Sequence, residues 1–262
     1  MAVYTLPKHL HPDFASGRKP VGGVEVDRDN WAGKELVYGT IFSRGAPIDV
    51  VSGMLGTTTG TAGPVADYFT YDGIDGKTVT TYQDVPDEWT YLIMFYPNDA
   101  AGTDNRYPMV MKDCLECTWE HSNAAFRAAV VTQDSGGYHA AHHNAVQSEW
   151  NHVAGSFDGA TLKAYLGGVL QTTNTDPVGV SITPTAPMQF GRSTSGSTGP
   201  WSGNIKHCLL FKKLFSDAQI AELSADPYQT LKPAVPISYF TAAAAGFEPQ
   251  WARHSNIILG SH

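Results

Sequence analysis

The chain has 262 residues, of which 42% are hydrophobic and 16% charged, and its formal net charge at pH 7 is −8. This much apolar material can build a core and excludes global disorder, while the negative charge excludes a nucleic-acid binder that relies on a basic face. The strongest apolar run, YLIMFY at 91–96, is too short to cross a bilayer, and the first twenty residues lack the apolar core of a signal peptide. We therefore expect neither membrane insertion nor a targeting signal.

The first element in chain order is a Pro- and Gly-rich segment, residues 1–30, which we expect to be an extended arm rather than a packed element. Short alternating segments follow, with turn residues between them. The expected strands are 68–73, 78–83, 89–97, 107–113, 115–122, 124–132, 150–157, 162–170 and 204–213. Such regular short strands predict an all-β protein, a sandwich or jelly roll.

Two cysteines, Cys114 and Cys117, lie in the sequence CLEC within this β-rich region. Positions three apart on a strand point to opposite faces, so the two thiols cannot hold one ion. A redox pair would need a helix N-terminus, which the sequence does not offer here. We expect structural thiols, and three cysteines in all favour assembly in a reducing cytoplasm.

Three histidines, His139, His142 and His143, lie close together in YHAAHHN. Imidazoles in a loop could bind zinc or nickel, but no acidic residue within the cluster could orient a ring. We expect a polar surface loop and no metal here.

The segment WNHVAGSF, 150–157, has apolar side chains on both faces and ends at Asp158-Gly159. It predicts a strand covered on both sides, followed by a hairpin turn. Further along, SDAQIAELSAD at 216–226 predicts a helix with Ser216 as N-cap and Gln219 completing a capping box. Ile220 and Leu223 form its apolar edge, and we expect a short lid on a sheet edge or rim.

The stretch WNHVAGSFDGATLKAYLGGVLQTT resembles the signature of LamG-like, concanavalin A-like jelly rolls, as do MQFGRST (188–194) and WSGNIKHCLLFKKLFSDAQIAEL (201–223). The resemblance covers roughly residues 31–226. It implies two curved antiparallel sheets with one short helix. One face of strand 150–157 would then lie between the sheets, and the other would line a concave surface.

The flanks ADPYQTLKP (225–233) and GRKPVGGVEVDRDNWAGKELVYGTIF (17–42) are similar to segments of tailed-phage virion proteins. This resemblance implies a structural or adhesive part of the particle: a head decoration, a fibre or a tail appendage. The implied partners are other virion proteins and further copies of the chain, and the implied location is the virion, assembled in the bacterial host cytoplasm. The implied organisation is an N-terminal arm (1–30), a LamG-like domain (31–226) and a C-terminal docking tail (227–262).

Two features invite comparison with other proteins of the same fold. Glycoside hydrolases on this fold use a Glu-x-Asp-x-x-Glu strand; Glu25 and Asp27 match it, but Asn30 replaces the second Glu, so we expect no enzyme. Some LamG domains bind calcium, which needs several oxygen ligands. We favour the turn for Asp158 and expect no cofactor, with calcium as the alternative.

The alternative function is recognition of host surface polysaccharide on the concave sheet, because exposed aromatic rings stack on sugars. The candidate residues are Trp119, Tyr138 and Trp201.

The C-terminal tail has aromatic residues without a clear period and prolines that we expect to project it away from the jelly roll. We predict that it packs against another subunit through Tyr239, Phe240, Phe247 and Trp251, with the last two as anchors. The competing interpretation is that it folds back on its own sheet.

Overall fold

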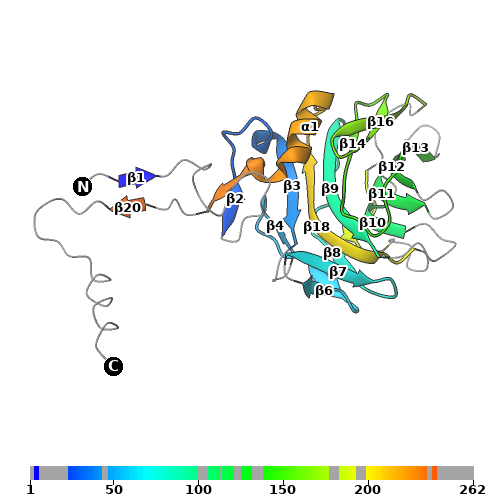
Figure 1. The fold of residues 1–262 in the computed structure, drawn as a ribbon, viewed down its shortest axis with the longest axis horizontal. Coiled ribbons are helices and arrows are strands. Elements are labelled where there is room, and N and C mark those ends of the chain that lie inside the picture. The colour runs from blue at the N-terminus through cyan, green and yellow to red at the C-terminus, as the bar shows by residue number, and fades with distance from the viewer. Residues whose placement is uncertain are drawn as a thin grey trace, which may run out of the picture.

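The computed structural model describes residues 3–5, 23–42, 47–65, 67–98, 106–112, 114–120, 125–131, 138–176, 183–192, 199–234 and 238–240. These residues form two antiparallel sheets packed face to face, with one α-helix on the outside (Figure 1). The predicted all-β, concanavalin A-like jelly-roll sandwich is confirmed.

The larger, nine-stranded sheet contains the longest strands of the protein. Its central path runs β16 (Val169–Asn174), β15 (Leu162–Leu166), β14 (Asn151–Phe157), β9 (Trp89–Pro97), β18 (Ser202–Phe211), β3 (Leu36–Ile41) and β4 (Ile48–Asp49). Strand β7 (Tyr68–Asp72) pairs with the first part of β18, and β6 (Gly63–Val65) pairs with β7.

The second sheet has seven strands. Their order is β13 (Tyr138–His143), β12 (Ala125–Val131), β11 (Leu115–Glu120), β10 (Arg106–Met111), β17 (Gln189–Phe190), β8 (Lys77–Val79) and β5 (Thr57–Thr59). At one edge the two sheets are joined by side chains of β16, because Asn174 Nδ2 donates to the Ala140 carbonyl oxygen (2.9 Å) and the Thr172 hydroxyl donates to that of His142.

The main core lies between the sheets and is rich in aromatic rings. Strand β9 alternates in the way its sequence predicts, with Trp89, Tyr91, Ile93 and Phe95 all buried in this core. Burying each such side chain stabilises the fold by about 1.5–3 kcal/mol. The inward side chains of the opposite sheet complete the core.

Strand β14 is buried on both faces, as predicted, but its second face does not line a concave surface. Val153 and Phe157 point into the core between the sheets. Ala154 belongs to a second apolar cluster, together with Leu92, Leu209 and residues of helix α1 (Asp217–Ala225). The outer face of the nine-stranded sheet is therefore covered at this point by a helix.

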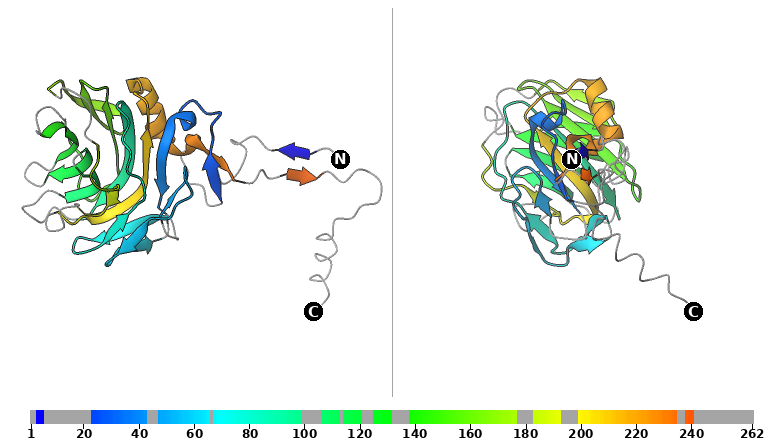
Figure 2. Two further views of the ribbon diagram at one scale, coloured as in Figure 1. Left: turned by 180° about the vertical axis from the view of Figure 1, so that it is seen from behind. Right: turned by 90° about the vertical axis from the view of Figure 1, so that its left-hand side faces the viewer.

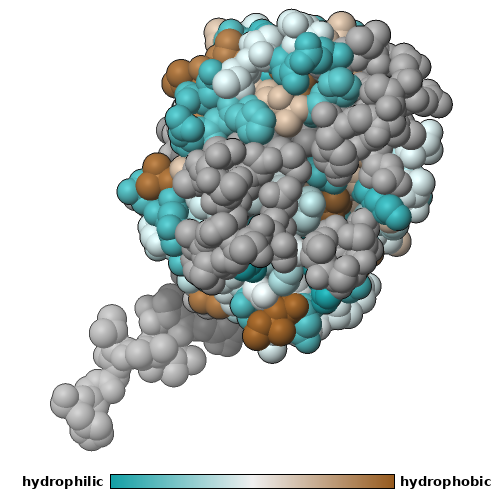
Figure 3. Space-filling model, turned by 90° about the vertical axis from the view of Figure 1, so that its right-hand side faces the viewer, coloured by the Kyte–Doolittle hydropathy of each residue, from teal (hydrophilic) through white to brown (hydrophobic). Residues whose placement is uncertain are grey.

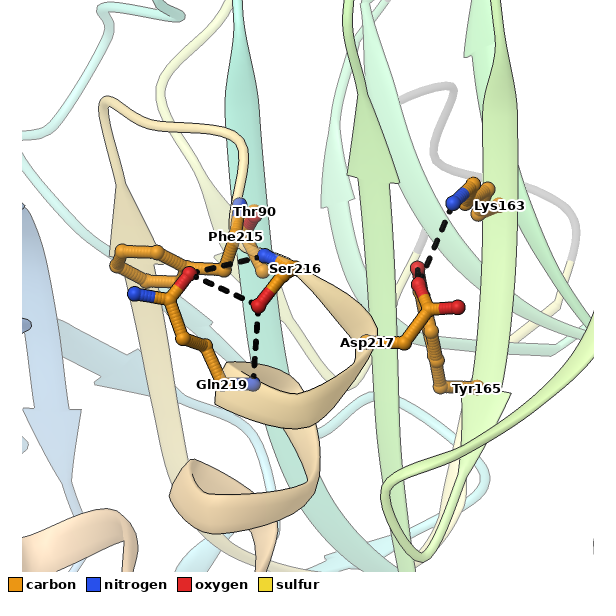
Figure 4. A network of polar contacts seen from close by, with 7 residues as sticks. All are labelled: Thr90, Lys163, Tyr165, Phe215, Ser216, Asp217 and Gln219. Atoms are coloured by element: carbon orange, nitrogen blue, oxygen red, sulfur yellow. Dashed lines mark hydrogen bonds and ion pairs between the residues drawn. The ribbon is translucent and has the colours of Figure 1, made fainter.

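Helix α1 begins at the predicted N-cap, but it does not lie on a sheet edge or rim as we predicted. Ser216 and Gln219 form the capping box (Figure 4). Ile220 and Leu223 are fully buried. The helix packs across the outer face of the sheet rather than on an edge or rim, because its apolar side meets the outward residues of several strands. At its N-terminus Asp217 accepts a hydrogen bond from the Tyr165 hydroxyl (2.9 Å) and pairs with Lys163 (3.3 Å), which together lower the pKa of this carboxyl.

The first described strands of the chain pair with the last described ones. Strand β2 (Val24–Val26) pairs with β19 (Leu231–Pro233), and β1 (Val3–Thr5) pairs with β20 (Ser238–Phe240). Both pairs lie on the same side of the sandwich, and the outer pair stands away from it (Figures 1 and 2).

Parts of the predicted arm and tail are packed rather than extended. Val26 joins the cluster under α1. The 3-10 helices η3 (Gly33–Glu35) and η5 (Pro227–Thr230) follow β2 and α1, and beyond α1 Tyr228 and Leu231 are buried. We expected the prolines of 227–235 to project the chain from the jelly roll, but residues 227–231 pack against it, because Tyr228 and Leu231 are buried. In the part of the chain that the structure describes, no helix is long and apolar enough to span a membrane.

Candidate functional site

For two of the three candidate sugar-binding residues, the prediction is wrong. Trp119 and Trp201 are each only 1% exposed, because both rings point into the core between the sheets. The Trp201 ring meets Phe95 edge to face with 5.4 Å between centroids. A ring enclosed in this way offers no face to a sugar. Tyr138 opens strand β13, and its side chain lies outside the described part of the structure.

The three histidines lie on a strand, not in the predicted loop. On β13, His139 and His143 share one face with Ala141, a core residue, while His142 points to the other face and is exposed. Residues four apart on a strand are separated by about 13 Å, so the three rings cannot hold one ion. Burial lowers the pKa of His143 to about 3, which keeps its ring neutral.

Asp158 forms the predicted turn between β14 and β15. Its Oδ1 accepts hydrogen bonds from the backbone N–H groups of Ala160 (2.9 Å) and Thr161 (2.6 Å). Gly159 has φ of +88°, a conformation that glycine adopts without strain. The carboxylate is thus used by the turn itself, and among the described residues no three His, Cys, Asp or Glu side chains are grouped as a metal site.

The cysteines are buried, and the acidic strand pairs with a later segment of the chain. Cys114, Cys117 and Cys208 are buried and form no disulfide, and burial raises the pKa of Cys117. Glu25 pairs with Lys232 across β2 and β19 (3.6 Å). Asn30 caps the following turn, since its Oδ1 accepts from the N–H groups of Ala32 (2.9 Å) and Gly33 (3.1 Å).

On the outer face of the seven-stranded sheet, to which the strands of Trp119 and Tyr138 belong, the residues in the middle are buried. Val110, Glu116 and Thr118 alternate with core residues and so point outward, yet all three are buried. Glu116 accepts a hydrogen bond from the Thr118 hydroxyl (3.3 Å). Viewed from this side, the described surface is a mixture of hydrophilic residues and separate small hydrophobic areas (Figure 3).

An exposed aromatic site lies instead on the outer face of the nine-stranded sheet. Trp150, immediately before β14, is the most exposed aromatic side chain among those that the structure describes, at 37%. Its ring meets Tyr68 and Tyr96 edge to face, with centroids 5.6 and 5.7 Å away. We call these three residues, with Asp67 and Lys206, the Trp150 platform.

The charged residues of the platform are held against the Trp150 ring. Lys206 Nζ lies over the ring, 5.5 Å from its centroid, and 2.7 Å from Asp67 Oδ2. A cation above an indole is attracted by the negative ring face, which fixes both groups. The platform therefore presents a fixed aromatic ring beside a hydrogen-bond donor and an acceptor.

Four neighbouring strands build this site: alternation turns the β9 and β7 residues outward, and Lys206 lies where β18 shifts its register between Ile205 and His207. Tyr96 follows the core residue Phe95 on β9, and Tyr68 precedes the core residue Phe69 on β7. Sequence reasoning placed Trp150 beside a doubly covered strand but did not select it. Alternation could have assigned it and Tyr96 to one outward face; nothing in the sequence showed that this end of the face stays uncovered.

The sequence from residue 70 to 221 matches the family model described as the concanavalin A-like lectin/glucanases superfamily, Laminin G type. The match covers more than half of the chain, so the protein belongs to this superfamily. No curated protein matches the sequence.

Solved structures share the fold at low sequence identity. The botulinum neurotoxin serotype D binding domain is 9% identical with a TM-score of 0.61, over 74% of this chain and 52% of that one. Domain 4 of a GH43 extracellular arabinanase from Geobacillus stearothermophilus, in complex with arabinotriose, is 14% identical with a TM-score of 0.57, over 72% and 98%. Trypanosoma rangeli sialidase, in complex with the inhibitor DANA, is 12% identical with a TM-score of 0.57, over 72% and 32%. The chain spans about half the length of the toxin domain it matches. At these identities the comparison shows a shared fold.

Proposed function

We propose that this protein is a non-enzymatic, adhesive part of a tailed-phage particle that binds host carbohydrate through the Trp150 platform. The observation that carries the binding proposal is the exposed Trp150 ring, fixed by Tyr68, Tyr96 and Lys206. An aromatic ring stacks on the apolar C–H face of a sugar, and polar groups at its rim orient the hydroxyls. Fixing the ring before binding lowers the entropy that binding costs.

The similar structures support the same class of function. Their names describe a toxin binding domain and an arabinanase domain in complex with arabinotriose. With this fold and an exposed tryptophan, binding of a saccharide is the most economical function for the platform.

The virion role is supported by the flanking sequences and by the position of the arms. The segments 17–42 and 225–233 resemble tailed-phage virion proteins, and the pairs β2–β19 and β1–β20 place the first and last described strands on one side of the sandwich. Such a shape suits a head decoration, fibre or tail appendage that is anchored by its ends to other virion proteins or further copies of itself. The proposed location is the virion, after assembly in the bacterial cytoplasm.

Binding is tested by titrating the purified full chain with host surface polysaccharide. We expect saturable binding at millimolar sugar or better, weakened about tenfold or more by Trp150→Ala, since a stacked ring contributes about 1 kcal/mol beyond its area. Leu55→Ala, which removes an exposed apolar side chain outside the platform, is the matched control and should bind normally. Absence of binding at millimolar sugar, or equal binding by Trp150→Ala, would reject the proposal.

The absence of a cofactor and of catalysis is proposed as well. Treatment with a chelator should leave binding unchanged; a loss that calcium restores would instead assign a role to Asp158. We expect no release of reducing ends from polysaccharide. Activity that disappears in Glu25→Gln would overturn the non-enzymatic assignment.

Anchoring is tested by deleting residues 236–262, which include Tyr239 and Phe240 of β20 as well as Phe247 and Trp251, which lie outside the described residues. Loss of assembly with an unchanged melting temperature supports docking on a partner. A large drop in melting temperature would show that the tail belongs to its own domain. Locating the subunit in an image of the particle tests the virion role directly.

A further inference from the structure

We propose that the ligand of the Trp150 platform is a neutral saccharide, one without a carboxylate, sulfate or phosphate group. This inference rests on the proposed carbohydrate-binding function and specifies its ligand class. It follows from how charge and hydrogen-bonding groups are arranged around the ring.

The cation of the platform is already neutralised. Lys206 Nζ lies 2.7 Å from Asp67 Oδ2, and the Lys206 side chain is only 23% exposed. An incoming anion would have to approach the Asp67 carboxylate, whose side chain is 51% exposed, at the same time as the ammonium. The attraction and the repulsion nearly cancel, so a negative charge on the ligand gains little and loses its hydration.

Beside this charged pair, uncharged groups lie in a row from β7 through β18 and β9 to the start of β14, and Thr70 and Asn204 extend the platform. Thr70 on β7 lies opposite Asn204 on β18, and Asn204 lies opposite Tyr96 on β9. Trp150 continues the row at the start of β14, next to Tyr96. All four side chains are partly exposed or exposed. The Thr70 hydroxyl, the Asn204 amide and the Tyr96 phenol can each donate and accept hydrogen bonds, as sugar hydroxyls do.

The exposed carboxylate is itself useful for a neutral sugar. Asp67 accepts hydrogen bonds from hydroxyls, and Lys206 beside it donates, so the pair matches two neighbouring hydroxyl groups of one ring. The Trp150 ring then covers the C–H face of the same sugar or of the next one. The whole chain adds to this preference, because its net charge of −8 repels polyanions at low salt.

The experiment compares neutral tetrasaccharides of glucose, galactose and mannose with acidic tetrasaccharides that contain glucuronic acid, galacturonic acid or sialic acid. We expect at least one neutral probe to bind about tenfold or more tighter than every acidic probe. Its affinity should change less than about twofold between low and high salt, because no net charge is neutralised on binding.

The variant Asp67→Asn separates the two ligand classes. A neutral probe should bind about fivefold more weakly, because a charged acceptor becomes a weaker one. An acidic probe should bind more tightly if it is the true ligand, since the repulsion is removed and Lys206 is released. Asp176→Asn, at an exposed position outside the platform, is the matched control for the change in charge, and a melting curve for each variant checks the fold.

The outcomes distinguish this inference from the function on which it rests. Tighter binding of acidic probes that depends on Trp150 and improves in Asp67→Asn overturns the neutral class but keeps the carbohydrate function. Failure of both classes to bind overturns the function and the inference together.

Discussion

The two ends of one sheet face differ in what covers them. Strands β14, β9 and β18 run the full length of the outer face of the nine-stranded sheet. At one end Ala154, Leu92 and Leu209 lie beneath helix α1 and are buried. At the other end the same strands place Tyr96, Trp150 and Lys206 at the surface. On β9 the alternation is unbroken, so Leu92 and Tyr96 share the outward face, whereas β18 shifts its register between Ile205 and His207. Helix α1 buries the outward residues at the first end, and at the second end the outward residues stay at least partly exposed.

A chain of hydrogen bonds marks the border between the two ends. His152 Nδ1 lies 2.9 Å from the Ser224 carbonyl oxygen, so it donates, and in the neutral ring Nε2 then accepts. His207 Nε2 lies 3.2 Å from His152 Nε2 and donates to it, and His207 Nδ1 lies 3.3 Å from the Tyr228 hydroxyl. These contacts tie the sheet to α1 and η5.

The largest effect is expected at the covered end. Ile220→Ala should lower the free energy of unfolding by about 3 kcal/mol, because the residue is fully buried and its removal leaves a cavity against the sheet. Chemical denaturation measures this, and sugar binding by the folded variant should stay normal. Leu214→Ala, at a partly exposed position of the preceding loop, should cost less than about 0.5 kcal/mol. Equal effects of the two variants would contradict the role given to α1.

Lowering the pH should reduce the free energy of unfolding through His152, which lies at the border between the covered and the open end of the sheet face. Burial lowers the pKa of His152 from 6.5 to about 4, so the unfolded chain binds a proton more readily than the folded one. The stability that this neutral ring contributes is complete above pH 6.5 and is lost as the pH falls from 6.5 towards 4. The loss is roughly 2–3 kcal/mol for such a shift.

Urea denaturation at several pH values checks this dependence. His152→Gln should flatten the curve between about pH 6.5 and 4. The contribution of buried His143, whose pKa is lowered to about 3, remains in this variant. Identical curves for the parent and His152→Gln would refute the assignment.

A smaller effect is expected where α1 begins. Ser216→Ala removes the side chain that accepts from the Gln219 N–H at 3.3 Å, and should cost about 1 kcal/mol. Ser216→Asp keeps an acceptor at the N-cap and should retain most of the stability. A thermal melt of both variants measures the difference; a Ser216→Asp protein as unstable as Ser216→Ala would show that the cap is not the cause.

The smallest effect on stability is expected at the open end. Trp150→Ala should cost less than about 1 kcal/mol, because the ring is partly exposed and loses only edge contacts and the cation above it. Measuring both the free energy of unfolding and sugar binding for each variant would distinguish the two ends. Ile220→Ala should mainly affect folding, and Trp150→Ala should mainly affect ligand binding. A loss as large as that of Ile220→Ala would make Trp150 a core residue.

The sequence alone determined the features that depend on neighbouring residues. The alternating strands, the turn at Asp158-Gly159 and the capping box of Ser216 and Gln219 all follow from contacts within a few positions. The apolar residues on both faces of β14 also predicted that both faces are buried. The structure confirms this, with one face in the core between the sheets and the other beneath helix α1.

Only the tertiary structure decided which aromatic rings are exposed, because exposure depends on segments far apart in the chain. Trp119 and Trp201 lie on inward faces and Trp150 on an outward one. Their sequences look equally suited to either, since a strand has two faces and its periodicity does not say which is inside. Whether the outward face is then buried depends on α1, which lies sixty residues beyond β14, and that packing is fixed by the whole sheet rather than by any local pattern.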